Sequence, residues 1–436
     1  MKIKCQLGGN NLNTWALILV LLFFSAIYWA GLQAVPFHPD ESTYIFMSTD
    51  LDVLFTNPRS LFWQPDQPAD PRMQYRLLDP PTSRYLVGIG RSLFGLSALP
   101  ADWDWSKNWQ QNQSAGALPA NKLLTVSRAA VAIFFPLSLL FLYLSANEIS
   151  GRLAAWLAML LLAGNTLMLL HTRRAMSESL LLFAVILTLY FLVHFQHKPW
   201  LSAFPVALAL NAKLSAAPLA AAGALCILII AVHQKWSFKK FFAQSLLYAA
   251  IIIAITLLLN PFLWSHPVAA GLASWQDRLE LTSRQVSTVA SVSPQQILDS
   301  FPKRLGNLIA HLFFTPPAIA DVANYLEQTA DAAKHYLANP LHALARDPFM
   351  ASLLLIISLS GFIFSLLDLL RSKSVQLLIL FIAGFAQIAA ILLLVPLPFQ
   401  RYVLPVLPFT CFWTAYGLSK FIQVFLAALK EKGFKP

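Results

Sequence analysis

Charged side chains are scarce in this sequence: they make up 12% of its 436 residues, whereas a soluble domain has about 25%. Cysteine is scarcer still, with only Cys5, Cys226 and Cys411. These lie in the N-terminal tail or inside apolar runs, so neither a disulfide framework nor thiol chemistry is expected. The composition, 57% hydrophobic, excludes an ordinary soluble enzyme and indicates a protein embedded in lipid.

Short motifs of several common chemistries are also missing. The sequence has no Walker loop, no GxGxxG and no HExxH or CxxC pair, so it predicts neither a nucleotide site nor a zinc site. Oxygen-only metal sites have no sequence signature, and Asp40, Glu41 and Glu178 leave a divalent cation open as a cofactor. The net charge of +11 does not indicate nucleic acid, because most of it flanks apolar runs.

Apolar runs of about twenty residues recur along the whole chain, and such runs cross a bilayer as helices. We therefore expect an all-α, polytopic membrane protein whose residues 1–436 form one domain. The first run is longer than a signal peptide and lacks a cleavage pattern before Pro36, so it is interpreted as a retained span. The ten predicted spans are 14–35, 125–146, 153–170, 178–195, 201–212, 214–232, 241–259, 349–370, 375–395 and 402–422.

Basic residues in alternate connecting turns predict which side of the membrane each turn lies on, since basic residues favour the cytoplasmic side. Both chain ends are then inside, and two long segments, 36–124 and 260–348, lie on the outer face. Each contains a stretch that we expect to lie along the interface as a helix: 84–96 is an apolar run too short to span, and 297–312 is amphipathic. The cytoplasmic residues in this scheme are Lys2, Lys4, Arg152, Lys198, Lys235, Lys239, Lys240, Arg371, Lys373, Lys430, Lys432 and Lys435.

The stretch 201–232 allows two interpretations, because it is too long for one straight span and too short for two full ones. Asn211 and Lys213 interrupt it, between Pro205 and Pro218. A single tilted span would move the segment 260–348 to the inside. A half-helix followed by a second helix keeps every basic flank inside, and we favour it because broken helices occur where backbone lines a site.

Several charges fall on the outer side, where basic residues are disfavoured. Asp40 and Glu41 follow the first span, and Asp40 is a candidate general base. The same acids also suit an ordinary helix start. Asp79 and Arg84 flank a double proline, and Arg84 could instead be an interfacial anchor.

Three further outer turns carry cations. Arg173 and Arg174 lie in one turn with Glu178, which could orient an arginine, hold an acceptor or simply pair with a cation. Lys213 lies in the predicted helix break, and Arg401 with Tyr402 begins the last span. Guanidinium groups bind phosphate oxygens, so together these cations indicate an anionic lipid headgroup as ligand.

These motifs resemble those of the polyprenol-phosphate-dependent glycosyltransferases of the GT-C fold, with protein O-mannosyltransferases and lipid A aminoarabinose transferases as the nearest relatives. The resemblance rests on Asp-Glu after the first span, Asp-Pro-Pro before a short helix, Arg-Ala-Met followed by an acid, the broken helix with its Lys, and Arg-Tyr-x-x-Pro at the last span. It covers most of residues 14–425, although the motifs are short. Asp79 stands where the family often has His, which leaves its role open.

The resemblance implies Asp40 as catalytic base with Glu41 beside it. It implies carrier-phosphate contacts for Arg84, Arg173, Arg174, Lys213 and Arg401, with Tyr402 adjacent, and an acceptor or orienting role for Glu178. No repeat domain separates the seventh and eighth spans, which favours a bacterial-type enzyme of the inner membrane.

The implied reaction moves a sugar from a polyprenyl phosphate to a hydroxyl of a protein, lipid or glycan on the outer face, with inversion. Two alternatives remain, an oligosaccharide ligase or polymerase with a diphosphate-linked donor and a transporter or flippase of lipid-linked sugars. The second would place charges near the bilayer midplane and show repeated halves. The sugar, the acceptor and the oligomeric state are not predicted.

Overall fold

The structure is a computed structural model that describes residues 11–65, 70–320 and 325–431. Within these ranges the regular structure is helical and no residue is assigned to a strand, as the all-α prediction requires. Lys2, Lys4, Cys5, Lys432 and Lys435 lie outside the described residues.

The apolar helices form one bundle and coincide with the ten predicted spans. Among the described residues, seven helical segments are long and apolar enough to cross a membrane, and three shorter apolar ones accompany them, beginning at Arg152, Glu178 and Pro199. The chain is therefore an integral membrane protein. The bundle comprises α1 (Asn11–Ala30), α7 (Asn121–Ala132), α8 (Phe134–Ser150), α9 (Arg152–Ala163), α10 (Thr166–His171), α11 (Glu178–His194), α12 (Ala203–Ala212), α13 (Ala217–His233), α14 (Phe238–Leu259), α18 (Pro348–Ser372), α19 (Val375–Leu394), and η10 (Gln400–Val406) leading into α20 (Leu407–Glu431).

The segment 201–232 is broken, as the favoured interpretation predicts. Helix α12 ends at Ala212, and Lys213 adopts an extended backbone with φ −161° and ψ 135°. A short turn, η4 (Leu214–Ala216), then leads into α13. The break places Lys213 after the last residue of α12, so its side chain is not confined to a face of that helix.

Both long segments contain short helices. The first holds α2 (Pro39–Met47), α3 (Thr49–Thr56), α4 (Pro71–Leu78), α5 (Thr82–Leu93) and α6 (Trp109–Ser114), and the second holds α15 (Pro267–Val292), α16 (Phe301–Ile309), the π-helical turn η7 (Ala310–Phe314) and α17 (Leu326–Ala338). The predicted stretch 84–96 is α5. The predicted helix over 297–312 begins later, at Phe301, because Ile297 and Ser300 are extended and a proline lies in the first turn.

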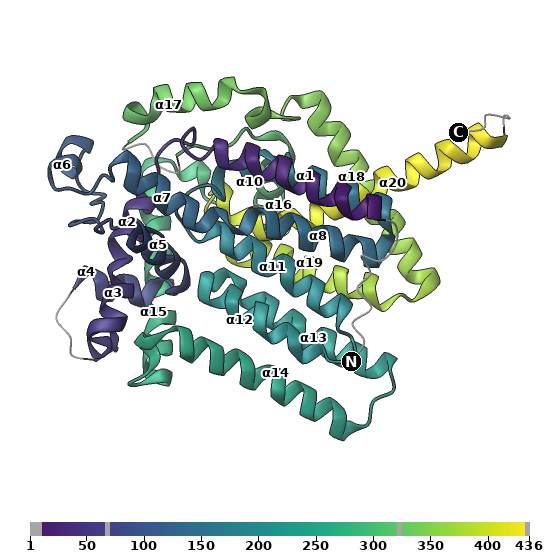
Figure 1. Cartoon of the computed structure of the whole chain (residues 1–436), viewed down its shortest axis with the longest axis horizontal. Helices are drawn as coiled ribbons and strands as arrows, with labels where there is room; N and C mark the ends of the chain where they lie inside the picture. Colours follow the sequence, from purple (N-terminus) through teal and green to yellow (C-terminus); the bar gives the residue numbers. More distant parts are fainter. Residues whose placement is uncertain (1–10, 66–69, 321–324, 432–436) are drawn as a thin grey trace.

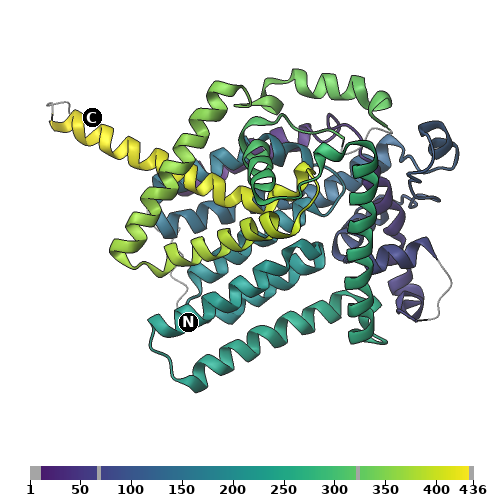
Figure 2. The same cartoon turned by 180° about the vertical axis from the view of Figure 1, so that it is seen from behind.

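The long segments gather at one end of the bundle, which we call the site end. Figure 1 shows α2–α5 at this end, while the start of α1, the α13–α14 turn and the end of α20 lie at the other. Helix α15 runs across the site end, transverse to the bundle helices (Figure 2), and packs against α4. This arrangement agrees with the predicted division into a basic end and a second end that carries the candidate site.

Candidate functional site

Helix α2 places Asp40 at its N-terminus. His38 caps this helix: its Nδ1 accepts the Asp40 N–H at 3.1 Å, and the Glu41 carboxylate accepts the His38 N–H at 3.1 Å. Such a reciprocal cap fixes where the helix begins. The Asp40 side chain remains 24% exposed and forms an ion pair with Arg401. It is thus a rigidly placed carboxylate that a substrate can reach.

Arg401 and its neighbour Tyr402 connect Asp40 to a second ion pair. Lys213 Nζ lies 2.7 Å from Glu178 Oε1 and 5.6 Å from the centroid of the Tyr402 ring. Glu178 is 1% exposed, whereas Lys213 is 19% exposed. Five residues predicted from four distant segments, Asp40, Glu178, Lys213, Arg401 and Tyr402, therefore form one cluster, which we call the Asp40 cluster.

Tyr44 also belongs to this cluster, although the sequence analysis did not select it. It lies one helical turn after Asp40 on α2, and the carboxylates of Asp79, Glu178 and Asp40 are near enough to act on it. Burial, followed by these carboxylates, raises the pKa of Tyr44 well above its ordinary value. Its hydroxyl therefore stays protonated and can donate a hydrogen bond. The i, i+4 spacing of Asp40 and Tyr44 could have indicated that both side chains lie on the same face of the helix.

Asp102 is a second residue that the sequence reasoning missed. Burial raises its pKa, while hydrogen bonds from Tyr75 and Thr43 act in the opposite direction, and Asp40 raises it further. The residue lies in the loop before α6, where no motif marks it. Asp102 therefore places a second carboxyl group near Asp40.

Glu41 points away from the Asp40 cluster into the protein. Arg128 binds it with two hydrogen bonds of 2.7 Å, from Nε and Nη2, and the Ala175 N–H donates to it at 2.9 Å. Burial raises the pKa of Glu41, but Arg128 outweighs it and the pKa is held below its ordinary value. The carboxylate is fully buried and joins α2, α7 and the turn that carries Arg173.

Arg173 and Arg174 are likewise buried. Arg173 donates to the carbonyl oxygens of Tyr28 at 3.0 Å and Ile27 at 3.2 Å, near the end of α1. Arg174 donates to the Ile319 carbonyl. The last carbonyls of a helix have no partner within it and attract cations. This accounts structurally for Arg173 on the disfavoured side, while Arg174 contacts a loop carbonyl. None of these hydrogen bonds joins either arginine to the residues of the Asp40 cluster.

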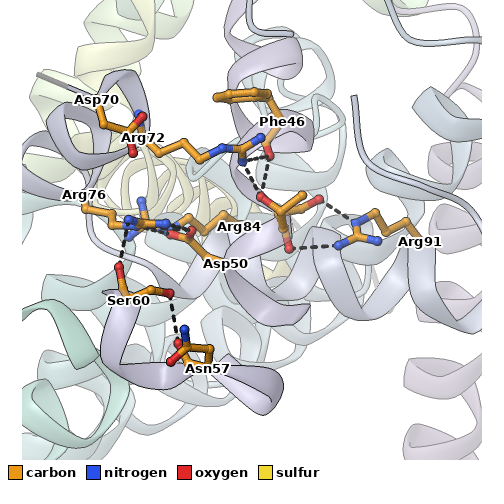
Figure 3. A network of polar contacts seen from close by, with 11 residues as sticks. Phe46, Asp50, Asn57, Ser60, Asp70, Arg72, Arg76, Arg84 and Arg91 are labelled. Atoms are coloured by element: carbon orange, nitrogen blue, oxygen red, sulfur yellow. Dashed lines mark hydrogen bonds and ion pairs between the residues drawn. The ribbon is translucent and has the colours of Figure 1, made fainter. Parts of the chain in front are cut away.

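Arg84 lies in a separate polar network on α3, α4 and α5 (Figure 3). Its Nε is 3.1 Å from Asp50 Oδ2, and Arg76 Nη2 is 2.6 Å from Asp50 Oδ1. Asp79, in contrast, lies close to Tyr44 and pairs with Arg278 of α15 at 2.9 Å. Asp79 is thus at the edge of the Asp40 cluster, whereas Arg84 is occupied elsewhere.

The three carboxylates considered as metal ligands do not meet at one point, because Glu41 lies apart from Asp40 and Glu178. Asp40 faces Arg401, Glu41 faces Arg128 and Glu178 faces Lys213. Among the described residues no group of three or more His, Cys, Asp or Glu side chains is placed to hold a metal ion. These acids, each with its own cation, do not fit a shared divalent ion.

Comparisons with known proteins give one partial family match and several structures of similar fold. The sequence model of the family described as dolichyl-phosphate-mannose-protein mannosyltransferase matches residues 72–268. No curated protein matches the chain. The matched region includes Asp79, Arg84, the turn with Arg173 and Arg174, and the break at Lys213.

Solved structures with the same fold cover nearly the whole chain. The archaeal oligosaccharyltransferase AglB of Archaeoglobus fulgidus, solved with an inhibitory peptide and a dolichol-phosphate, has a TM-score of 0.53 at 14% identity over 98% of this chain and 53% of its own. ArnT of Cupriavidus metallidurans, bound to undecaprenyl phosphate, has a TM-score of 0.50 at 13% identity over 92% of this chain and 60% of its own.

The chain spans about half to three fifths of the length of these two proteins. Their identities to it are low, so the likeness concerns the fold. The chain has the GT-C-like fold of these two structures, and its residues 72–268 match the sequence model of the protein mannosyltransferase family.

Proposed function

We propose that this chain transfers a sugar from a polyprenyl monophosphate to a hydroxyl acceptor at the outer face of a bacterial-type inner membrane. The observation that carries the proposal is the ion pair of the partly exposed Asp40 with Arg401, directly beside Lys213 and Glu178. A base and two cations in one cluster suit a reaction in which one group loses a proton while another gains negative charge. The solved relatives with bound carrier phosphates support the class of donor.

In the proposed reaction Asp40 takes the proton of the acceptor hydroxyl. The acceptor oxygen forms a bond to the anomeric carbon as the bond from that carbon to the phosphate oxygen breaks, with inversion. The leaving group is polyprenyl phosphate. Arg401 shifts from Asp40 toward the phosphate as the carboxylate becomes neutral, and Lys213 supplies the second positive charge.

The remaining residues hold this geometry. Glu178 orients Lys213, Tyr402 lies beside the ammonium group, and Tyr44 donates a hydrogen bond toward the acceptor or the phosphate. Glu41 keeps α2 in place through Arg128. We assign a similar positioning role to Arg173 at the end of α1 and to Arg174 at the Ile319 carbonyl. Asp79 and Arg278 fix the loop that leads into α5, and Arg84 stabilises the start of that helix through Asp50.

The test is a panel of defined donors given to purified protein with envelope extract as acceptor. We expect consumption of one polyprenyl-monophosphate sugar, release of polyprenyl phosphate and a glycosylated product of inverted configuration. Consumption of only diphosphate-linked donors would contradict the proposal and favour a ligase or polymerase. Movement of lipid-linked sugar between leaflets without glycosidic bond formation would favour a flippase.

A further inference from the structure

An apolar cavity with one cationic end lies apart from the Asp40 cluster. It has a volume of about 370 Å³ and lies between α9, α18 and α20, with η7 beside it. Leu157, Leu161, Leu354 and Leu418 form much of its wall. Leu160, Leu344 and Met350, at 40%, 53% and 38% exposure, also line it. In a bundle surrounded by lipid, these partly exposed apolar residues make the cavity accessible from the membrane.

Arg346 forms the polar end of this cavity. Its Nε donates to Thr166 Oγ1 at 2.8 Å and its Nη1 donates to the His311 carbonyl at 2.9 Å. Among the described residues no carboxylate pairs with Arg346, and none accepts a hydrogen bond from its Nη2. Arg76 and Arg128, which are buried, differ from Arg346 because each of them binds an acid.

The charge of Arg346 requires compensation. Burial lowers its pKa to about 10, so the guanidinium remains cationic at neutral pH. A partly buried cation without an acid partner is costly, and an anion from outside the chain would offset that cost. Guanidinium groups bind phosphate oxygens with directed hydrogen bonds, and basic pockets between membrane helices bind anionic headgroups.

We propose that this cavity binds an anionic phospholipid, with its phosphate at Arg346 and one acyl chain between α9, α18 and α20. An apolar body with one phosphate matches an apolar cavity with one guanidinium. The cavity also lies next to residues that contact the segment carrying Arg401. His311, whose carbonyl accepts from Arg346, contacts the Pro398 carbonyl at 3.0 Å, and Gln400 donates to the Pro316 carbonyl at 3.1 Å. The bound lipid therefore supports η10 from behind.

This inference is independent of the proposed sugar transfer, and its test measures lipid binding. The full chain is purified in detergent, exchanged against phosphatidylglycerol, phosphatidylcholine or inorganic phosphate, and examined by native mass spectrometry. We expect one tightly held phosphatidylglycerol, weaker retention of phosphatidylcholine, and no displacement by inorganic phosphate.

Two variants and one control make the test specific. Arg346→Gln removes the charge, and we expect about a tenfold loss of bound phosphatidylglycerol, as for a lost charge-assisted hydrogen bond. Leu354→Trp fills the cavity while Arg346 stays in place, so it gives the same test if Arg346→Gln fails to fold. Arg371→Gln, on the exposed far end of α18, should leave binding unchanged. Equal retention of both lipids, or unchanged retention in both cavity variants, would overturn the proposal, as would displacement by inorganic phosphate.

Discussion

Lys213 Nζ lies 2.7 Å from Glu178 Oε1, although the two residues are 35 positions apart and the lysine lies in the break between two helices. The pair fixes a cation beside Tyr402 and Arg401 while the acid itself is buried. Breaking such a pair leaves an uncompensated charge, whereas removing both partners avoids that cost. The pair thus makes it possible to separate stability from activity.

We expect Lys213→Met to lower both the thermal stability and the rate of transfer. The double variant Lys213→Met with Glu178→Gln should recover most of the stability, because no buried charge is left unpaired. It should remain about 10²-fold slower in transfer, the effect of losing one charge-stabilising group. Thermal melts and donor consumption measured on the same preparations test this. A double variant that regains full activity would show that Lys213 does not act on the phosphate.

Glu41→Gln should destabilise the fold by about 3–5 kcal/mol, because Arg128 would lose its buried partner. The pKa of Glu41 is held below its ordinary value of 4.5. Its stabilising effect is therefore present above that value and is lost as the pH falls through the lower, folded-state pKa. Melting temperatures of wild type should fall with pH in that range, and the variant should lack that component.

The matched control for Glu41 is Glu327→Gln, because Glu327 is exposed on α17. It should leave both the melting temperature and its pH dependence unchanged. If Glu41→Gln melted like wild type, the positioning role of Glu41 would be refuted.

Tyr44→Phe should slow transfer about tenfold without lowering the melting temperature, since it removes one hydrogen-bond donor and leaves the ring. Because the pKa of Tyr44 is raised, the hydroxyl stays protonated, and the shape of the pH profile near neutrality should not change. Tyr85→Phe, on α5, is the control and should retain wild-type activity. An unchanged rate in Tyr44→Phe would remove Tyr44 from the proposed site.

The crossing of α18 and α20 depends on Gly361. A Cβ at this position would lie 1.8 Å from the Trp413 carbonyl oxygen, on the backbone of the facing helix. Gly361→Ala should therefore separate the helices and prevent a monodisperse preparation. Gly271→Ala on α15, where a Cβ meets open space, should behave as wild type in size-exclusion chromatography. A well-folded Gly361→Ala protein would contradict the close approach.

Local sequence properties were sufficient to predict the spans and the break at Lys213. Hydropathy, length and interrupting polar residues determine both, and neither requires knowledge of distant contacts. Part of the site was also predictable, because acids and cations at the outer helix ends had to gather at one end of the bundle. Asp40, Glu178, Lys213 and Arg401 could be selected in this way.

The partners of these charges could not be predicted. Arg173 binds carbonyl oxygens of α1 that lie about 145 residues earlier in the chain, and Glu41 finds Arg128 on α7. From sequence alone, an arginine that closes a helix end cannot be distinguished from one that awaits a phosphate. Tyr44 and Asp102 were missed because their position depends on how α2 and the loop before α6 pack against other segments.

The assignment of Asp40 as the general base is tested most directly by single-turnover release of polyprenyl phosphate. The release is measured for wild type, Asp40→Asn and Asp299→Asn. Asp299 is an exposed acid that pairs with Lys303, so its variant controls for loss of a carboxylate elsewhere. We predict that Asp40→Asn releases polyprenyl phosphate about 10²–10⁴-fold more slowly than wild type, as expected for loss of a general base. Asp299→Asn should release it at the wild-type rate. Equal release by Asp40→Asn and wild type would contradict the assignment of Asp40 as the base.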